Sequence, residues 1–184
     1  MNPIQFPELS NERRYDDSAE IYPVHYTYKT APAEDVVKVF SILSKYLCRR
    51  LKYRDVEDGG ILGISNGMIA HYYRDHYAQR TAESILYAPD DLNWIIHEWN
   101  KIGTTFGGLI HCHPAHRKAP STSDLQYVAM LLTFNPQLPS VLLCIVADGL
   151  NFYRFERDFL TYWEENHCLS KPTSNCIFYE TIIK

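Results

Sequence analysis

A short apolar run that ends in two histidines constrains the fold of this chain more than any other feature. Residues 107–114 read GGLIHCHP, so His111 and His113 stand two positions apart at the end of the run. Side chains at i and i+2 of a β-strand point to the same face, so a strand here aims both imidazoles at one point and turns Cys112 the other way. Pro114 has no amide hydrogen for a sheet ladder, and we expect the strand to end there.

A serine-rich segment that follows the histidines predicts a third ligand. Ser121 or Ser123 is a good N-cap for a helix, which places Asp124 in the first turn with its carboxylate facing back toward the loop. Two imidazoles and one carboxylate are three ligands for a tetrahedral zinc and leave the fourth position for water, the pattern of a catalytic site. A lone histidine is more often a core residue, and a lone Asp here often only favours the helix dipole. The fixed spacing of the whole set is what favours a metal site.

The pattern His-x-His-Pro, then six residues, then Ser-x-x-Asp resembles the JAMM motif of the JAB/MPN metalloprotease family. His111, His113, Ser121 and Asp124 match it position for position. The resemblance implies that the two histidines and the aspartate bind one zinc ion, and that Ser121 helps to polarise the scissile carbonyl. Cys112 stands where the family usually has Ser or Thr, and since it faces away from the metal we expect no effect on zinc binding.

The same resemblance implies a glutamate upstream that serves as the general base. The family carries it in the form Glu-x-x-Gly-x-Leu, which residues 57–62 fit. Composition alone would make Glu57 a surface residue. The resemblance assigns the base to Glu57 ahead of the other candidate carboxylates, which are Asp58, Glu83 and Glu98. The glycines at 59, 60 and 63 are small enough for a substrate strand to approach closely, and we expect the backbone near 59–60 to pair with an extended substrate tail.

The order of the predicted elements indicates an α+β fold. The elements are a helix over 32–51, a hairpin turning at 66–67, a helix between Pro89 and Gly103, a strand over 105–112, a helix from about 123 to 135, and a second hairpin with strands at 141–146 and 152–155. Such an order predicts a mixed sheet with helices against it. This agrees with the curved mixed sheet flanked by helices, JAB/MPN-like and cytidine-deaminase-like in architecture, that the resemblance implies.

One domain accounts for most of the 184 residues, a length that can bury a sizeable core. We expect a JAB/MPN-like catalytic domain at 34–158, an N-terminal extended arm at 1–33 and a C-terminal extension packed on the domain at 159–184. The arm either packs on the domain or binds a partner, and we favour the first. Weaker patterns predict an edge strand at 21–28, a short helix at 159–165 and a last strand at 176–183.

Net charge, apolar runs and cysteine spacing indicate which partners and which cellular compartment to expect. The net charge of −4 gives no reason to expect nucleic acid as a partner. No run of eighteen apolar residues and no signal-peptide pattern is present, so we expect no membrane segment. The five cysteines are scattered and form no CxxC pair, which fits reduced thiols in a cytoplasm.

The resemblance implies a zinc-dependent metalloprotease that hydrolyses isopeptide or peptide bonds after the C-terminal glycine of ubiquitin or a ubiquitin-like protein. A zinc-bound water activated by Glu57 would be the nucleophile, and E1/E2-like proteins of the same pathway are possible partners. Two alternatives stay open. One is a zinc amidohydrolase acting on a small or non-ubiquitin substrate, because no long insertion is visible between Glu57 and His111. The other is a non-catalytic MPN-type scaffold.

Overall fold

A mixed β-sheet organises the part of the chain that the computed structural model describes, which is residues 4–7, 27–30, 37–52, 54–114, 117–160 and 177–181. Seven strands of this part form the sheet in the order β1-β9-β8-β7-β6-β2-β3, and β4 pairs separately with β5. The helices are α1 (Ser41–Leu51), α2 (Pro89–Lys101) and α3 (Thr122–Phe134). The strands are β1 (Thr27–Thr30), β2 (Gly59–Ser65), β3 (Met68–Arg74), β4 (Gln79–Arg80), β5 (Ile85–Leu86), β6 (Thr105–Cys112), β7 (Ser140–Val146), β8 (Leu150–Glu156) and β9 (Ile177–Thr181).

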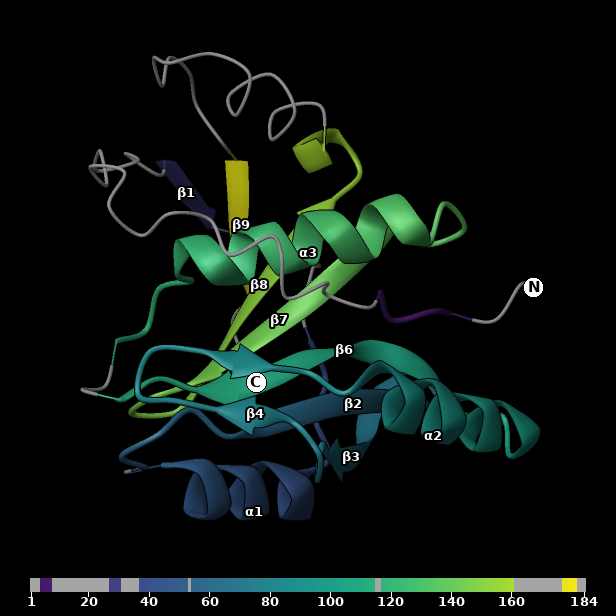
Figure 1. Cartoon of the computed structure of the whole chain (residues 1–184), viewed down its shortest axis with the longest axis horizontal. Helices are drawn as coiled ribbons and strands as arrows, with labels where there is room; N and C mark the ends of the chain where they lie inside the picture. The colour runs from purple at the N-terminus through teal and green to yellow at the C-terminus, as the bar shows by residue number, and fades with distance from the viewer. Residues whose placement is uncertain are drawn as a thin grey trace.

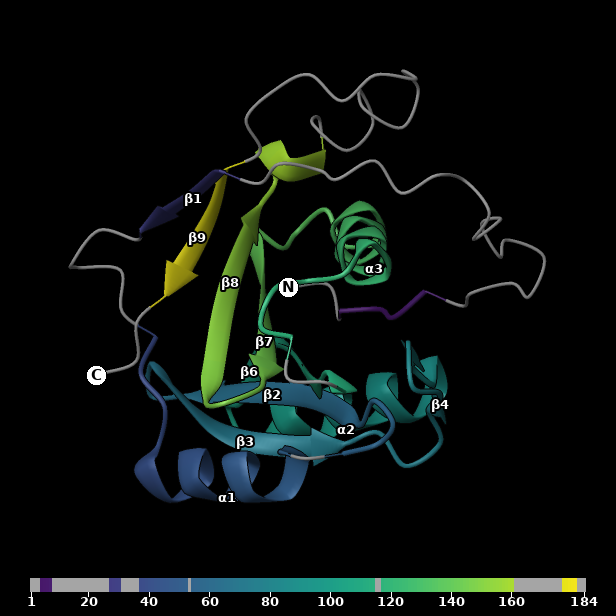
Figure 2. The same cartoon turned by 90° about the vertical axis from the view of Figure 1, so that its left-hand side faces the viewer.

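Helices cover both faces of this sheet (Figures 1 and 2). Leu109 of β6 belongs to a buried cluster with the apolar side chains of α2 and α3, whereas its neighbour Ile110 belongs to a second cluster with those of α1. Successive strand residues point to opposite faces, so the two clusters lie on opposite sides of the sheet. The predicted mixed sheet flanked by helices is therefore confirmed.

The predicted hairpin at 66–67 is confirmed, but the role predicted for the glycines beside it is wrong. Asn66 and Gly67 have φ angles of 51° and 72° and turn β2 into β3. Both edges of β2 are occupied by strands of the same chain, β3 and β6. A Cβ atom on Gly59 would lie 2.1 Å from the Ile110 carbonyl oxygen, and one on Gly60 would lie 1.9 Å from the Tyr73 carbonyl oxygen. These glycines serve contacts within the sheet, and their backbone is not open to a substrate tail.

The helix predicted over 32–51 begins later than expected. Residues 37–40 are not helical, Phe40 is extended, and α1 starts at Ser41. The Phe40 amide donates to the Ile69 carbonyl at 2.9 Å, and the Ile69 amide donates to the Lys38 carbonyl at 2.8 Å. Hydrogen bonds to the edge strand β3 thus replace the first turns of the predicted helix. Residues 32–36 of that prediction lie outside the described residues.

The remaining elements follow the sequence pattern closely. Pro89 is the first residue of α2, and Gly103 follows the helix with a φ of 74°. The second hairpin forms between β7 and β8, and β9 falls within the predicted range 176–183. β1 pairs in parallel with β9 at the end of the sheet. Most of the edge strand predicted at 21–28 and of the short helix at 159–165 lies outside the described residues.

A parallel crossover sets the position of the histidines. β6 and β7 are parallel neighbours, and α3 connects them. β6 therefore ends on the side of the molecule on which α3 begins (Figure 1). Ligand sites in such sheets commonly lie at the carboxyl ends of parallel strands. No helix in the described residues has the length and apolar character needed to cross a membrane.

Candidate metal centre

Four buried polar side chains converge where β6 ends. His111 is the last residue but one of β6, His113 lies just beyond the strand, and Asp124 lies in the first turn of α3. Glu57 comes directly before β2, which pairs with β6 so that Gly59 lies opposite His111. The exposed fractions of these four residues are between 1% and 9%. The structure thus brings together every metal ligand predicted from the sequence, with the predicted base beside them.

The spacing of the donor atoms fits a metal ion. The two histidine Nε2 atoms are 2.9 Å apart, and each lies 3.1 Å from one oxygen of Asp124. In a tetrahedral zinc site with bonds of 2.0–2.1 Å, neighbouring ligand atoms are separated by about 3.3 Å. Glu57 Oε1 lies 3.8 Å from His113 Nε2. Glu57, His111 and His113 each offer one donor atom within 4.8 Å of the other two, so this buried group can hold a metal ion.

Burial and charge together shift the pKa values of these groups. Burial raises the pKa of Glu57, and the nearby imidazoles only partly oppose it. Burial alone would raise the pKa of Asp124 as well, but the two imidazoles hold it well below its usual range. For His111, burial alone would lower the pKa, but the carboxylates of Asp124 and Glu57 raise it. Asp124 is therefore strongly held as an anion, whereas Glu57 is tuned toward accepting a proton.

Ser121 fixes the orientation of Asp124. Its hydroxyl donates to Asp124 Oδ2 at 2.7 Å and accepts from the Asp124 amide at 3.2 Å, while its own amide donates to the same Oδ2 at 2.7 Å. This reciprocal capping box identifies Ser121, rather than Ser123, as the N-cap of α3. The single hydroxyl hydrogen of Ser121 points to Asp124 in this arrangement. Hydrogen bonds of this kind orient metal ligands.

Two neighbours of the centre have no clear signal in the sequence. The Tyr87 hydroxyl lies 3.4 Å from His111 Nδ1 and is buried. The Glu57 amide donates to the Thr81 carbonyl at 2.8 Å, which ties the base to the segment between β4 and β5. Both contacts join segments more than twenty residues apart, so no local periodicity predicts them. A sequence-based prediction of either contact would require knowing which distant segments pair in the fold.

Cys112 faces away from the centre, as the strand alternation predicts. Its side chain belongs to the cluster on the α1 side of the sheet and accepts from the Asp58 amide at 3.4 Å. Burial raises the pKa of this thiol to about 11. The thiol is therefore a buried, protonated core group and takes no part in the metal centre.

Comparisons with known proteins support the fold. A Desulfitobacterium hafniense protein of known solution structure aligns with a TM-score of 0.53 and 14% identity, over 81% of this chain and 96% of that one. A Salinibacter ruber protein, also solved in solution, aligns at a lower TM-score of 0.43 with 19% identity, over 80% of this chain and 90% of that one. The first of these matches shows that the chain shares its α+β fold. No protein-family model matches the sequence, and neither does any curated protein.

Proposed function

We propose that this chain is a zinc-dependent hydrolase of the JAMM type, which cleaves isopeptide or peptide bonds after the C-terminal glycine of ubiquitin or a ubiquitin-like protein in the cytoplasm. The observation that carries the proposal is the buried triangle of two imidazoles and one carboxylate, with Glu57 beside it. A zinc ion bound there would act as a Lewis acid toward water and the scissile carbonyl. The substrate class comes from the motif resemblance, and the experiment below tests it separately.

The distances favour different roles for the two carboxylates, with Asp124 as a metal ligand and Glu57 as the general base. Asp124 approaches both imidazoles at 3.1 Å, whereas Glu57 lies 3.8 Å from His113 and is within 4.8 Å of a donor atom of each histidine. We therefore assign His111, His113 and Asp124 as the ligands and leave Glu57 outside the ligand set. A carboxylate next to the reacting water, with a pKa raised by burial, can take up a proton and pass it to the leaving amine.

Ser121 has a double task in this proposal. It holds Asp124 through its hydroxyl, and it would turn that hydroxyl toward the oxyanion that forms at the scissile carbonyl. Loss of one such donor typically raises the barrier by about 2.7–4 kcal/mol. The Ser121 amide also donates to Asp124 Oδ2, so the Asp124 carboxylate keeps one of its two hydrogen bonds from Ser121 when the hydroxyl turns.

Metal content of four purified proteins tests the ligand assignment. We expect one zinc per chain in the unaltered protein and in Glu57→Gln, and little or none in His113→Ala and Asp124→Asn. If Glu57→Gln loses its zinc while Asp124→Asn keeps it, the ligand set is Glu57, His111 and His113, and the assigned roles of the two carboxylates are wrong. If the unaltered protein cannot be loaded with zinc, the hydrolase proposal fails and a scaffold role is favoured.

Activity assays then test the reaction and the substrate class. The zinc-loaded protein is incubated with linear fusions and isopeptide conjugates of ubiquitin-like proteins, and in parallel with small acylated amides. We expect cleavage after the terminal glycine of a modifier, abolished in Glu57→Gln although its zinc remains. Hydrolysis of the small amides alone would replace the proposed substrate class with the small-molecule alternative.

A further inference from the structure

Basic side chains gather on the side of the sheet that carries α1, around the end of that helix. The chain as a whole has a net charge of −4, yet six of its 18 lysine and arginine residues lie at this one place. They come from α1, from the segment after it, and from β3 and β4. The six are Arg49, Arg50, Lys52, Arg54, Arg74 and Arg80.

A single carboxylate pairs with four of these arginines. Asp58 is 3% exposed, and Arg74 and Arg80 each place their Nε atom 3.0 Å from its Oδ1. Arg50 and Arg54 lie further away, at 3.6 and 3.8 Å from Oδ2. One negative charge therefore faces four positive ones, and the two nearer arginines already neutralise it. Arg50 and Arg54 keep an excess of positive charge that an added anion would stabilise.

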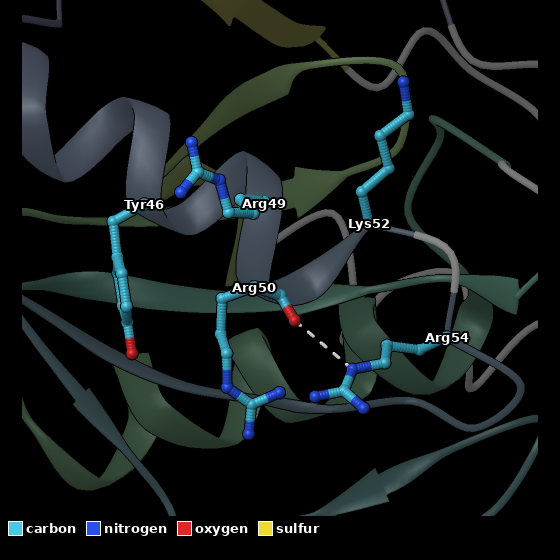
Figure 3. Close-up of a pocket in the computed structure, with 5 residues that line it drawn as sticks. All are labelled: Tyr46, Arg49, Arg50, Lys52 and Arg54. Atoms are coloured by element: carbon cyan, nitrogen blue, oxygen red, sulfur yellow. Dashed lines mark hydrogen bonds between the residues drawn. The ribbon is translucent and has the colours of Figure 1, made fainter.

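Arg50 and Arg54 both line a hollow that adjoins a second one. One, of about 380 Å³, is lined by Tyr46, Arg49, Arg50, Lys52 and Arg54 (Figure 3). The next, of about 490 Å³, shares Tyr46 and Arg50 with the first. Its other lining residues are Leu43, Tyr72, Tyr73, Arg74 and His76. The first hollow is thus mainly cationic and the second largely aromatic, and their volumes lie within the range of sites for small ligands.

Two tyrosines give the second hollow its character. Tyr46 is 50% exposed, and its ring centroid lies 6.3 Å from that of Tyr72. The Tyr72 hydroxyl is buried and has no hydrogen-bond partner among the described residues. Burial and the nearby Asp58 raise its pKa, so the group stays protonated and needs an acceptor. The exposed ring of Tyr46 offers a flat aromatic surface on which a planar ligand can stack.

We propose that these two hollows form a nucleotide-binding site, in which Arg50 and Arg54 bind the phosphates and the base lies against Tyr46. Planar guanidinium groups match phosphate oxygens in geometry and charge, and aromatic rings stack on bases. A free phosphate would use only the cationic hollow. An acidic peptide would likewise leave the aromatic hollow without a partner. The phosphate subsite lies away from the metal centre, because α1 packs on the side of the sheet to which Ile110 points, whereas the next residue, His111, points to the other side.

Calorimetric titration of the full chain tests this site with ADP, pyrophosphate, adenosine and a glutamate-rich peptide. We expect ADP to bind best, and Arg50→Gln/Arg54→Gln to weaken ADP binding by roughly tenfold or more. Tyr46→Ala should weaken the binding of ADP but not that of pyrophosphate. Lys101→Gln removes one positive charge from α2, where Lys101 pairs with Glu98, and should change nothing.

The same titrations contain the outcomes that would overturn the proposal. Equal affinity for pyrophosphate and ADP would remove the base subsite, and tighter binding of the acidic peptide would replace the nucleotide by a protein partner. Unchanged ADP binding in the double arginine variant would place the nucleotide elsewhere. Because nucleotide phosphates can also ligate zinc, ADP binding must persist in His113→Ala. If the double variant fails to fold, the exposed Tyr46→Ala variant still carries the test.

Discussion

Replacing Ser121 by alanine removes two interactions at the start of α3 whose sizes follow from the structure. The hydroxyl caps the helix by accepting from the Asp124 amide, and such a cap is worth about 1 kcal/mol. It also donates to the Asp124 carboxylate, a type of bond worth about 1.5–3 kcal/mol. The lower end applies, because the Ser121 amide still donates to the same oxygen. We expect Ser121→Ala to lower the free energy of unfolding by about 2.5 kcal/mol.

The assay is urea unfolding in the presence of a chelator, so that metal binding does not enter the measured free energy. Ser123→Ala is the matched control, since it lies in the same helical turn but is exposed and makes no side-chain hydrogen bond with a described residue. Its effect should stay within about 0.5 kcal/mol. Equal destabilisation by the two variants would refute the capping argument, as would a loss below about 0.5 kcal/mol in Ser121→Ala.

The same variant separates two ways in which Ser121 can act on catalysis. If it only orients Asp124, zinc affinity falls by about 10–100-fold and kcat follows the loss of metal. If the hydroxyl also binds the oxyanion, kcat remains low when the variant is saturated with zinc, whereas KM changes little. An unchanged kcat at saturating zinc would exclude the oxyanion role.

Three further expectations concern the same region. In chelator-treated protein, the pair formed by His111 and Asp124 should stabilise the fold most between pH 3.8 and pH 6.5. These limits are the ordinary pKa values of an aspartate and a histidine; folding lowers the pKa of Asp124 and raises that of His111, so both groups are charged throughout this range. Its contribution should decline as the pH rises through the raised pKa of His111 or falls through the lowered pKa of Asp124, and unfolding curves of the unaltered protein and Asp124→Asn across this range measure the difference. Tyr87→Phe should lower zinc affinity by less than about tenfold, because the hydroxyl lies 3.4 Å from His111 Nδ1, and competition with a zinc indicator checks this. Gly59→Ala should prevent folding, because its Cβ would lie 2.1 Å from a backbone oxygen of the neighbouring strand, and circular dichroism detects the loss.

The sequence predicted those parts of the centre that depend on short-range geometry. Strand alternation places His111 and His113 on one side, and helix capping places Asp124 facing back toward them, so three ligands could be named from local spacing. Glu57 is different, because it reaches the histidines only through the pairing of β2 with β6. Its assignment came from the motif resemblance. Tyr87 reaches His111 through tertiary contact alone and was missed.

The sequence analysis misplaced the start of α1 and did not predict the basic surface, and the reason is the same in both cases. Apolar spacing and two acidic residues favoured a helix from residue 32, but the hydrogen bonds to Ile69 of the edge strand are available only in the folded sheet. The arginines around Asp58 come from four separate segments, and whole-chain charge conceals them because the total is negative. Patterns within one element therefore predicted that element, whereas contacts between elements required the structure.

Two adjacent carboxylates connect the metal centre with the basic surface. Glu57 faces the imidazoles, and Asp58 faces the arginines, as successive residues entering a strand must. The Asp58 backbone also exchanges hydrogen bonds with Cys112, its amide donating to the thiol sulfur and its carbonyl accepting from the Cys112 amide at 3.0 Å. Arg74 and Arg80 hold the Asp58 side chain, so the same contacts that fix Asp58 fix the backbone from which Glu57 projects. A ligand that drew Arg50 and Arg54 toward itself would leave this anchor in place, because the two arginines nearest to Asp58 are not the ones assigned to the phosphates.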